Sequence, residues 1–368
     1  QIIKLVEEAQ GSKAPIQELA DKVAAIFVPV VLIIAFASFF IWILLGKGFV
    51  FGLTTFIAVL IIACPCSLGL ATPTAVMVGT GKAAENGIII KNAASLQIAA
   101  EIDKIIFDKT GTLTEGKPKL TDIVSYSGNE EEVLMLAASL EKPSGHILSD
   151  AMVGAAQERG ISLKPMRQFE TISGEGVVGQ IEENLTILAG NRRLMQDRTI
   201  DLKIASGDLD RLEKQGKTIT LVAKGNQLVG LVAVRDTVKE FAKVLIDKLK
   251  RMGKDVIMIT GDNKRTAAAI AEEIGIEKVL AEVLPKDKLD EIKKLQNEGF
   301  KVAFVGDGIN DAPALSQADL GIAIGSGTDV AIESGDIILI KDDLRDVAMA
   351  IDLSGYAMRK IRQNLFWA

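Results

Sequence analysis

Two long stretches without charged residues constrain most strongly what this chain can fold into. Residues 23–45 read VAAIFVPVVLIIAFASFFIWILL, which exceeds the roughly 20 apolar residues that a helix needs to span a bilayer. Residues 48–80 are also uncharged and contain two prolines. The predicted segments are a cytosolic lead-in over residues 1–22, a membrane helix over residues 23–46 and a second, broken membrane helix over residues 49–82.

The lysines around these stretches indicate the orientation of the chain. Lys13, Lys22, Lys82 and Lys91 lie at the outer ends, whereas Lys47 alone lies in the short connection between the stretches. Positive charge collects on the cytoplasmic side of a membrane, so both outer ends are expected in the cytoplasm. We therefore predict a multi-pass protein embedded in membrane lipid, in the cell membrane if prokaryotic, with its catalytic domains in the cytoplasm.

Composition argues against two other classes of protein. The net charge of -6 gives no reason to expect a nucleic-acid partner. Both cysteines lie inside the second apolar stretch, so neither a disulfide framework nor an oxidising compartment is indicated.

Beyond the membrane stretches, three short apolar runs each precede a loop that contains an acidic residue and a glycine. The runs cover residues 104–107, 255–259 and 301–305, and helical patterns cover residues 263–275 and 286–299. This alternation predicts βαβ units around a parallel sheet. Ligands bind at the carboxyl ends of such strands, so we expect the three acidic loops to meet at one crevice.

A different pattern separates the first run from the second. Between residues 116 and 235 the chain has Gly-rich turns and short alternating strands, such as residues 176–181, 185–189 and 218–222. This pattern inside a parallel sheet indicates an inserted α+β domain. The predicted cytosolic α/β domain has two parts, residues 83–116 and 235–354, around an insertion over residues 117–234, and a further membrane helix is expected to start within residues 355–368.

Asp108 is a candidate nucleophile because it directly follows the run Lys-Ile-Ile-Phe. A carboxylate can accept a phosphoryl group from ATP and divide one difficult step into two easier ones. The Lys, Thr and Gly that follow can supply a cation, hydroxyls and backbone N–H groups to phosphate oxygens. The alternative is a solvated Asp-Lys pair that opens an ordinary turn.

Phosphoryl transfer also needs Mg2+ ligands and a cation for the transferring oxygens. Asp307 is a hard oxygen ligand suited to Mg2+, together with the Asp108 carboxylate and a loop carbonyl such as that of Thr110. Lys288 would counter phosphate charge. Taken singly, Lys288 could be a solvated helix lysine and Asp307 a turn former. The presence of an acidic loop at each of three strand ends favours a phosphoryl-transfer site over these structural roles.

Residues 108–114, DKTGTLT, resemble the phosphorylation motif of the P-type ATPases. Together with TGD at 260–262 and GDGINDAP at 306–313, they resemble the phosphorylation domain of that family, which has a haloacid-dehalogenase-like Rossmannoid fold. The resemblance implies that Asp108 accepts phosphate from ATP and that Asp307 binds Mg2+. The predicted catalytic residues are Lys288, at the start of a helical pattern, and, on these motifs, Asp108, Lys109, Thr110, Thr260, Gly261, Asp262, Asn310 and Asp311.

Thr110 marks a departure from soluble phosphatase relatives, many of which place a second Asp two residues after the nucleophile as a general acid. With threonine at that place, hydrolysis lacks the assistance of the acid, so the acyl phosphate is expected to persist. A persistent phosphate suits a pump intermediate better than a phosphatase.

Residues 174–179, GEGVVG, match the pattern G-x-G-x-x-G, but a dinucleotide site is not indicated. The pattern lacks a preceding parallel strand, a following helix and a ribose-binding acid at the expected distance. The insertion instead resembles the nucleotide-binding domain of the heavy-metal P-type ATPases, although Ile147 stands where that family usually has Pro. The residues that match its ATP-contacting set are Glu141, His146, Gly174, Gly176, Gly190 and Asn191.

Cys64 and Cys66 flank Pro65 in the middle of the second apolar stretch. Pro65 breaks the helix and frees the carbonyl of Ile61, so two thiolates that would otherwise point apart can share one ion. Soft thiolates prefer Cu(I) and can also bind Zn(II). The alternative is that the two cysteines bind no metal and serve only as small buried hydrophobic residues. Residues 63–74 resemble the copper-exporting branch of the heavy-metal pumps, with Ser67 in place of the usual Ala.

These resemblances imply ATP-driven export of Cu+, and possible use of silver, through an aspartyl-phosphate. The implied partners are a copper chaperone that delivers the ion and the actuator and metal-binding domains of a full-length protein, which we expect this incomplete chain to lack. The alternatives are a zinc- or cadmium-transporting P-type ATPase, a membrane-anchored phosphatase of the haloacid-dehalogenase type and a non-enzymatic metal sensor.

Overall fold

The computed structural model describes residues 9, 11–12, 14–63, 66–144, 147–172, 174–181, 185–284, 287–307, 311–325 and 333–367. The chain divides into two compact units. One unit comprises Gln1–Ile102 with Asp319–Ala368, and the other comprises Asp103–Ala318.

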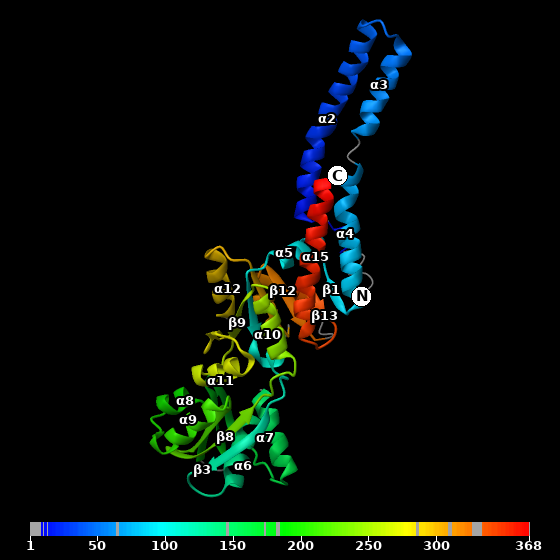
Figure 1. Cartoon of the computed structure of the whole chain (residues 1–368). Coiled ribbons are helices and arrows are strands. Elements are labelled where there is room, and N and C mark those ends of the chain that lie inside the picture. Colours follow the sequence, from blue (N-terminus) through cyan, green and yellow to red (C-terminus); the bar gives the residue numbers. More distant parts are fainter. Residues whose placement is uncertain are drawn as a thin grey trace. The chain divides into compact units, whose positions relative to one another are not determined.

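Long helices dominate the first unit, where α2 is blue and α15 is red in Figure 1. α2 (Pro15–Leu44) begins at a proline, which the first turn of a helix tolerates because the N–H there has no helical partner. Within the described residues, α2 is the one helix both long and apolar enough to cross a membrane. The apolar run predicted over residues 23–46 therefore lies in a helix whose polar first turns begin earlier.

The second apolar stretch forms two helices. α3 (Phe49–Ile62) is a shorter apolar helix that packs against α2, and α4 (Cys66–Glu85) follows it. The break predicted within residues 49–82 thus falls between these two helices. Cys64 and Pro65 lie outside the described residues, as does the side chain of Cys66.

Helix α15 (Arg345–Trp367) packs against α4 and against α5 (Ala93–Glu101). It starts before residue 355, where the sequence predicts a membrane helix, because its first half is amphipathic and buries residues such as Val347 and Ile351. Beside these helices, β13 (Ile337–Leu339) pairs in parallel with β12 (Leu320–Ile324) and antiparallel with β1 (Ile88–Ile90).

In the second unit, β2 (Lys104–Asp108) lies within a parallel sheet. It pairs with β11 (Val302–Gly306) on one side and β9 (Asp255–Ile259) on the other, and β10 (Lys278–Leu280) pairs with β9. All residues of β2 and β11 are buried, which explains the apolar runs at residues 105–107 and 302–305. The predicted parallel sheet is confirmed, and the helices of this domain are α10 (Ala242–Arg251), α11 (Lys264–Ile274), α12 (Lys288–Asn297) and α13 (Ala312–Gln317).

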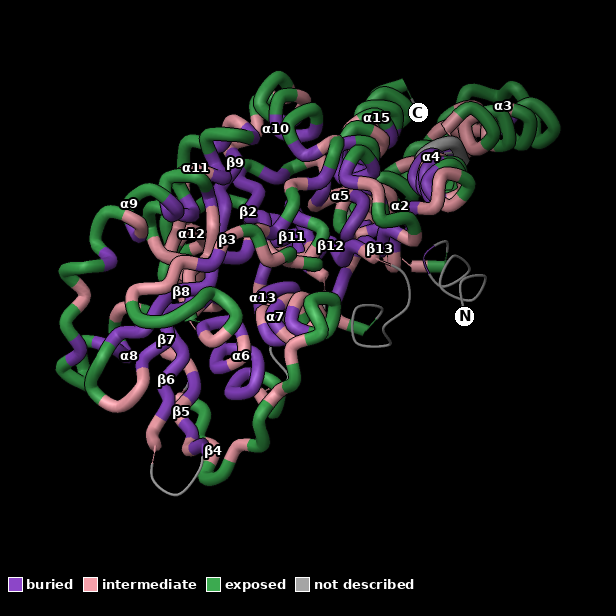
Figure 2. Tube along the Cα trace, turned by 90° about the horizontal axis from the view of Figure 1, so that it is seen from below, coloured by how far each residue is buried: buried purple, intermediate pink, exposed green. Residues whose placement is uncertain are grey.

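The chain from β3 to β8 forms a separate antiparallel sheet of order β3-β8-β7-β6-β5-β4, which confirms the inserted α+β domain. Helices α6 and α7 cover one face of this sheet, and α8 and α9 cover the other (Figure 2). Each pair of helices packs on a separate apolar cluster, so most of β6, β7 and β8 is buried. The elements of this inserted domain are β3 (Lys119–Ser125), α6 (Glu130–Glu141), α7 (Ile147–Glu158), β4 (Arg167–Ile172), β5 (Gly176–Ile181), β6 (Leu185–Gly190), α8 (Arg192–Asp197), a helical turn at Lys203–Ala205, α9 (Ser206–Lys214), β7 (Thr218–Lys224) and β8 (Gln227–Arg235).

Candidate active site

The carboxyl ends of β2, β9 and β11 bring three loops together. Asp108 is the last residue of β2 and lies in register with Ile259 of β9, while Phe107 lies in register with Val305 of β11. Because the three strands are parallel, the loops that follow them leave the sheet at the same edge. The three acidic loops therefore lie together, as the pattern of apolar runs predicts.

Lys288, the first residue of α12, lies between two carboxylates. Its Nζ is 2.8 Å from Asp108 Oδ1 and 2.7 Å from Asp311 Oδ1. Lys288 is 8% exposed, Asp108 7% and Asp311 1%. A buried cation between two carboxylates offsets part of the cost of removing their charges from water.

The protonation of these two carboxyl groups is perturbed. The pKa of Asp108 is raised to about 7, first by burial and then by the Asp311 carboxylate, while Lys288 and Lys109 act to lower it. Burial likewise raises the pKa of Asp311 against the opposing effect of Lys288. A more basic carboxylate at a strand end is a stronger nucleophile than an exposed aspartate.

A second ion pair joins the loops after β2 and β9. Lys109 Nζ lies 2.5 Å from Asp262 Oδ2, and Lys109 is buried. The buried Thr260 accepts a hydrogen bond at Oγ1 from the backbone N–H of Asp262 at 3.1 Å, which shapes the turn at Gly261. Lys109 therefore orients the carboxylate of the second loop.

Gly111 and Asp307 approach each other at the edge of the first loop. Gly111 has a φ of 75°, and a Cβ there would lie only 3.2 Å from Asp307 Oδ2. The carboxylates of Asp307 and Asp108 and the carbonyl of Thr110 offer the oxygen donors that Mg2+ prefers. In the described part of the chain, no group of three or more His, Cys, Asp or Glu side chains could hold a metal ion. This sparse set fits Mg2+, which binds through one or two carboxylates plus waters and substrate phosphates.

Asp236 and Lys239 contact the first loop from the segment that returns from the inserted domain. Asp236 accepts hydrogen bonds from Thr114 Oγ1 at 2.5 Å and from the Lys117 N–H at 3.2 Å. Lys239 Nζ donates to the carbonyl of Gly111 at 3.1 Å. Neither residue stands in a predicted motif. The available signal was an acidic residue directly after the apolar strand β8.

A cavity of about 610 Å³ lies at these strand ends, a size typical of small-molecule sites. Residues of the parallel-sheet domain and of the inserted domain both line it. The structure places in its lining the predicted residues Asp108, Lys109, Thr110, Thr260, Gly261, Asp262, Lys288, Asp307, Asp311, Glu141, Gly174 and Gly176.

Glu141 is fixed at the end of α6 by two serines. Its Oε2 accepts a hydrogen bond from Ser144 Oγ at 2.8 Å, and its carbonyl accepts one from Ser149 Oγ at 2.8 Å. Glu141 and Ser144 both line the cavity, although Ser144 is absent from the predicted set.

Gly190 and Asn191 contact the turn at Gly174 but do not line the cavity. Asn191 Nδ2 donates to the carbonyl of Gly174 at 2.8 Å. A Cβ at Gly190 would come within 2.4 Å of the carbonyl oxygen of Glu175, so only glycine permits this close approach. These two residues therefore shape the turn that borders the cavity.

The G-x-G-x-x-G pattern lies at an antiparallel strand. Its last four residues belong to β5, which pairs antiparallel with β4 and β6. This pairing differs from the parallel strand, turn and helix of a dinucleotide fold and agrees with the expectation that the pattern is not such a site.

The structure does not describe the side chains of four predicted residues. His146, Asn310 and Cys64 lie outside the described residues, and so does the side chain of Cys66. Their roles stay predictions.

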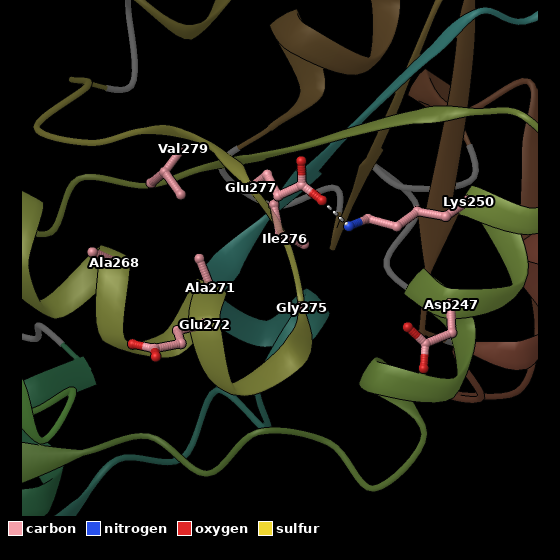
Figure 3. A pocket seen from close by; sticks show the side chains of 9 residues that line it. All are labelled: Asp247, Lys250, Ala268, Ala271, Glu272, Gly275, Ile276, Glu277 and Val279. Carbon is pink, nitrogen blue, oxygen red and sulfur yellow. Dashed lines mark hydrogen bonds and ion pairs between the residues drawn. The ribbon is translucent and has the colours of Figure 1, made fainter.

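A second cavity of about 530 Å³ lies among α10, α11 and β10, and none of the predicted catalytic residues lines it (Figure 3). The ammonium of Lys250 points toward Glu277 and pairs with its carboxylate at 2.6 Å. We assign no chemistry to this cavity.

Comparisons with known proteins match residues 102–319 to the haloacid dehalogenase-like hydrolases. A probable copper-exporting P-type ATPase of Archaeoglobus fulgidus is 54% identical over 373 residues, which cover 100% of this chain and 45% of that protein. The copper-exporting P-type ATPase of Bacillus subtilis is 49% identical over 370 residues, which cover 100% of this chain and 46% of that protein. The chain thus spans less than half the length of these relatives.

The fold is also similar to that of a solved pump. The crystal structure of a zinc-transporting PIB-type ATPase in the E2.Pi state aligns with a TM-score of 0.72 and 36% sequence identity. The alignment covers 99% of this chain and 59% of that one.

Proposed function

Because this chain belongs to the haloacid dehalogenase-like hydrolase family and matches P-type ATPases along its whole length, we propose that it is the catalytic and ion-binding part of a pump that uses ATP to export Cu(I). One observation carries the proposal. Asp108 lies buried at a strand end, beside the Lys288 ammonium, in a cavity that the inserted domain also lines.

In the proposed reaction, a carboxylate oxygen of Asp108 attacks the γ-phosphorus of ATP. A bond forms between that oxygen and phosphorus, the bond to the bridging oxygen breaks, and ADP leaves with the electron pair. Lys288 supplies positive charge next to the attacked phosphoryl group, and Thr260 and the Gly261 N–H offer hydrogen bonds to its oxygens. Water later splits the acyl phosphate into the Asp108 carboxylate and inorganic phosphate.

Asp307, Asp108 and the Thr110 carbonyl would hold Mg2+, which supplies charge neutralisation for the phosphate oxygens when it is bound. The chain itself holds the reacting groups in place. The Lys109–Asp262 ion pair fixes the second loop, and Lys288 opposes the burial that raises the pKa of Asp108.

We assign ATP to the cavity between the inserted domain and the parallel-sheet domain. Glu141, Gly174 and Gly176 line its inserted-domain side, so they would contact the nucleotide directly. Gly190 and Asn191 would act by shaping the turn at Gly174. His146 belongs to the proposed site through the sequence resemblance alone.

Monovalent copper is the proposed cargo, bound by the thiolates of Cys64 and Cys66. The two curated relatives that are about half identical to this chain are named as copper exporters, whereas the similar zinc-transporting structure is 36% identical. A zinc pump is the second candidate because that structure aligns with nearly the whole chain. We further propose that actuator and metal-binding domains of a longer, multi-pass membrane protein act with this chain, and that a chaperone delivers the ion.

The proposal is tested on the full-length protein with ATP labelled at the γ-phosphate. We expect Mg2+-dependent transfer of label to the protein in the presence of Cu(I) or Ag(I), lability of the label to hydroxylamine, and its loss in Asp108→Asn. If Zn(II), but not Cu(I) or Ag(I), stimulates the transfer of label, the cargo is zinc and not copper. ATP turnover that is independent of metal and unchanged in Asp108→Asn would refute the pump altogether.

A further inference from the structure

The start of helix α11 contacts the inserted domain and directly follows the loop that borders Asp108. Asp262 and Asn263 precede its first residue, so the helix continues directly from the loop that borders Asp108. Arg265 and Thr266, in its first turn, contact the inserted domain. The start of α11 therefore links the loop after β9 to α9 and to the start of β7.

Arg265 makes ion pairs across the boundary between the two domains. Its Nη1 atom pairs with Asp210 and lies 3.3 Å from Glu213 Oε2, both on α9. Glu213 also accepts two hydrogen bonds from Arg192, from Nη2 at 2.8 Å and from Nε at 3.1 Å. The Glu213 side chain is 5% exposed, so two arginines, one from each domain, neutralise a nearly buried carboxylate.

Thr266 adds a buried hydrogen bond to this boundary. Its Oγ1 donates to the carbonyl of Lys217 at 2.9 Å, and Thr266 is 0% exposed. The next residue, Thr218, lines the cavity and donates from Oγ1 to Asp262 Oδ1 at 3.4 Å. The contact thus runs without interruption from α9 to the carboxylate that pairs with Lys109.

We propose that Arg265 and Thr266 are positioning residues for phosphorylation of Asp108, because they hold the inserted domain against the start of α11. We call the contacts of Arg265 with Asp210 and Glu213, and of Thr266 with Lys217, the α9–α11 latch. This inference rests on the proposed function, since positioning matters only if the inserted domain carries ATP to Asp108.

The latch matters because only two chain segments join the inserted domain covalently to the parallel-sheet domain. These segments follow β2 and β8 and pair with each other through the bridge between Thr114 and Val238. A domain on such a hinge can change its orientation, and a small misplacement of ATP would slow in-line transfer. The Arg265–Asp210 pair joins side chains that are 53% and 52% exposed, and such pairs are individually weak, so this part of the latch favours the contact between the domains without locking the hinge.

Hydrogen exchange tests the latch without any phosphoryl chemistry. In Arg265→Gln and in Thr266→Val, we expect faster amide exchange in both α9 and α11 of the full chain in detergent. Arg211→Gln is the matched control, because Arg211 is a similarly exposed arginine of α9 that pairs with Asp208 on the same helix. It should leave exchange in α11 unchanged. Unchanged exchange in both latch variants would overturn the latch.

Phosphorylation of the full-length protein tests the positioning role. We expect the maximal rate of label transfer to fall about threefold in Arg265→Gln, which loses two ion pairs of a half-exposed arginine, and about fivefold in Thr266→Val, which loses one buried hydrogen bond. Affinity for trinitrophenyl-ATP should stay within about twofold, because neither residue lines the cavity.

Arg265→Lys separates positioning from a general loss of structure. One nitrogen of Arg265 makes both contacts on α9, so a lysine ammonium can replace it and should restore most of the rate. Rates equal to wild type in both latch variants would overturn the positioning role. A wild-type protein that takes no label at all would instead refute the proposed function, and the exchange data would still decide whether the latch exists.

Discussion

Asp311 can reach Lys288 because residue 306 is a glycine. A Cβ at Gly306 would lie 2.6 Å from Asp311 Oδ2 and 2.9 Å from the ring of Phe304. Phe304 is fully buried in β11 and has little room to move in a close-packed interior. The Lys288–Asp311 contact therefore depends on the backbone of β11 as well as on charge.

Gly306→Ala should displace Asp311 from Lys288 and strain the packing around Phe304. We expect it to lower the free energy of unfolding by about 1–3 kcal/mol, as overpacking of a core does. It should also slow phosphorylation of Asp108, because Lys288 loses one of its two carboxylate partners. Thermal unfolding in detergent and label transfer from ATP measure the two effects.

The control for this variant is Gly207→Ala in α9, where nothing lies within 4 Å of the added Cβ. It should leave stability unchanged or slightly raised, because alanine favours a helix. If Gly306→Ala were as stable as this control, the close approach of Asp311 to Gly306 would be wrong.

Thr110 allows a test of why the acyl phosphate should last. Thr110→Asp places a carboxyl group two residues after the nucleophile, where it can act as a general acid or base for attack by water. We expect hydrolysis of labelled phosphoprotein to speed up at least about tenfold. Thr110→Asn, which matches the size of Asp but cannot transfer a proton in this way, should not accelerate it. Equal decay in both variants would show that position 110 does not control the lifetime.

At the scale of secondary structure, the sequence predicts best those elements whose pattern is set by burial. The predicted strands over residues 176–181 and 255–259 coincide with β5 and β9. The helical pattern over residues 263–275 corresponds to α11, with Asn263 as its N-cap and a left-handed Gly275 at its end. The starts of α2 and α15 are predicted less well, because an apolar run locates the apolar part of a helix and not its polar start.

Contacts between distant elements could not be predicted in the same way. The sequence nominates Asp108, Lys288 and Asp311 separately, yet the position of Lys288 between the two carboxylates follows from how α12 packs beside β11. Asp236 and Lys239 were missed for the same reason. They stand in the return segment after β8, and their role depends on the pairing of that segment with the loop after β2.

This return segment supports a prediction of its own. Asp236→Ala removes one of the two acceptors of Thr114 Oγ1, leaving the Lys109 carbonyl, and the acceptor of the Lys117 N–H. Because Thr114 is 0% exposed, we expect a loss of about 1–3 kcal/mol in the free energy of unfolding and slower phosphorylation. Asp236 lines the cavity on the side of the loop after β2, so the Glu141 and Gly174 side stays intact and affinity for trinitrophenyl-ATP should change little.

Glu240→Gln is the control for the Asp236 variant, because Glu240 lies close by in the sequence and is exposed. It should behave like wild type in both stability and phosphorylation. A normal phosphorylation rate in Asp236→Ala would mean that the segment after β8 does not hold the loop of Asp108.

At the scale of the whole molecule, the proposed pump would have to link ion binding in one compact unit to phosphoryl transfer in the other. The predicted copper ligands belong to the unit of Gln1–Ile102 with Asp319–Ala368, and Asp108 belongs to Asp103–Ala318. Linkage between two binding sites is reciprocal, so each ligand must change the affinity of the other by the same factor. Coupling of this kind separates a pump from a phosphatase that is merely anchored to a membrane.

We therefore expect Cu(I) to change the affinity of the full-length protein for a non-hydrolysable ATP analogue by a factor of about 5 to 150. The analogue should change the affinity for Cu(I) by the same factor, measured by competition with a coloured Cu(I) chelator. Replacing Cys64 and Cys66 by serine should abolish both effects and preserve binding of the analogue, because serine oxygens are poor ligands for Cu(I). A factor close to one in the wild-type protein would argue against coupling, and coupling that survived the double substitution would place the copper site elsewhere.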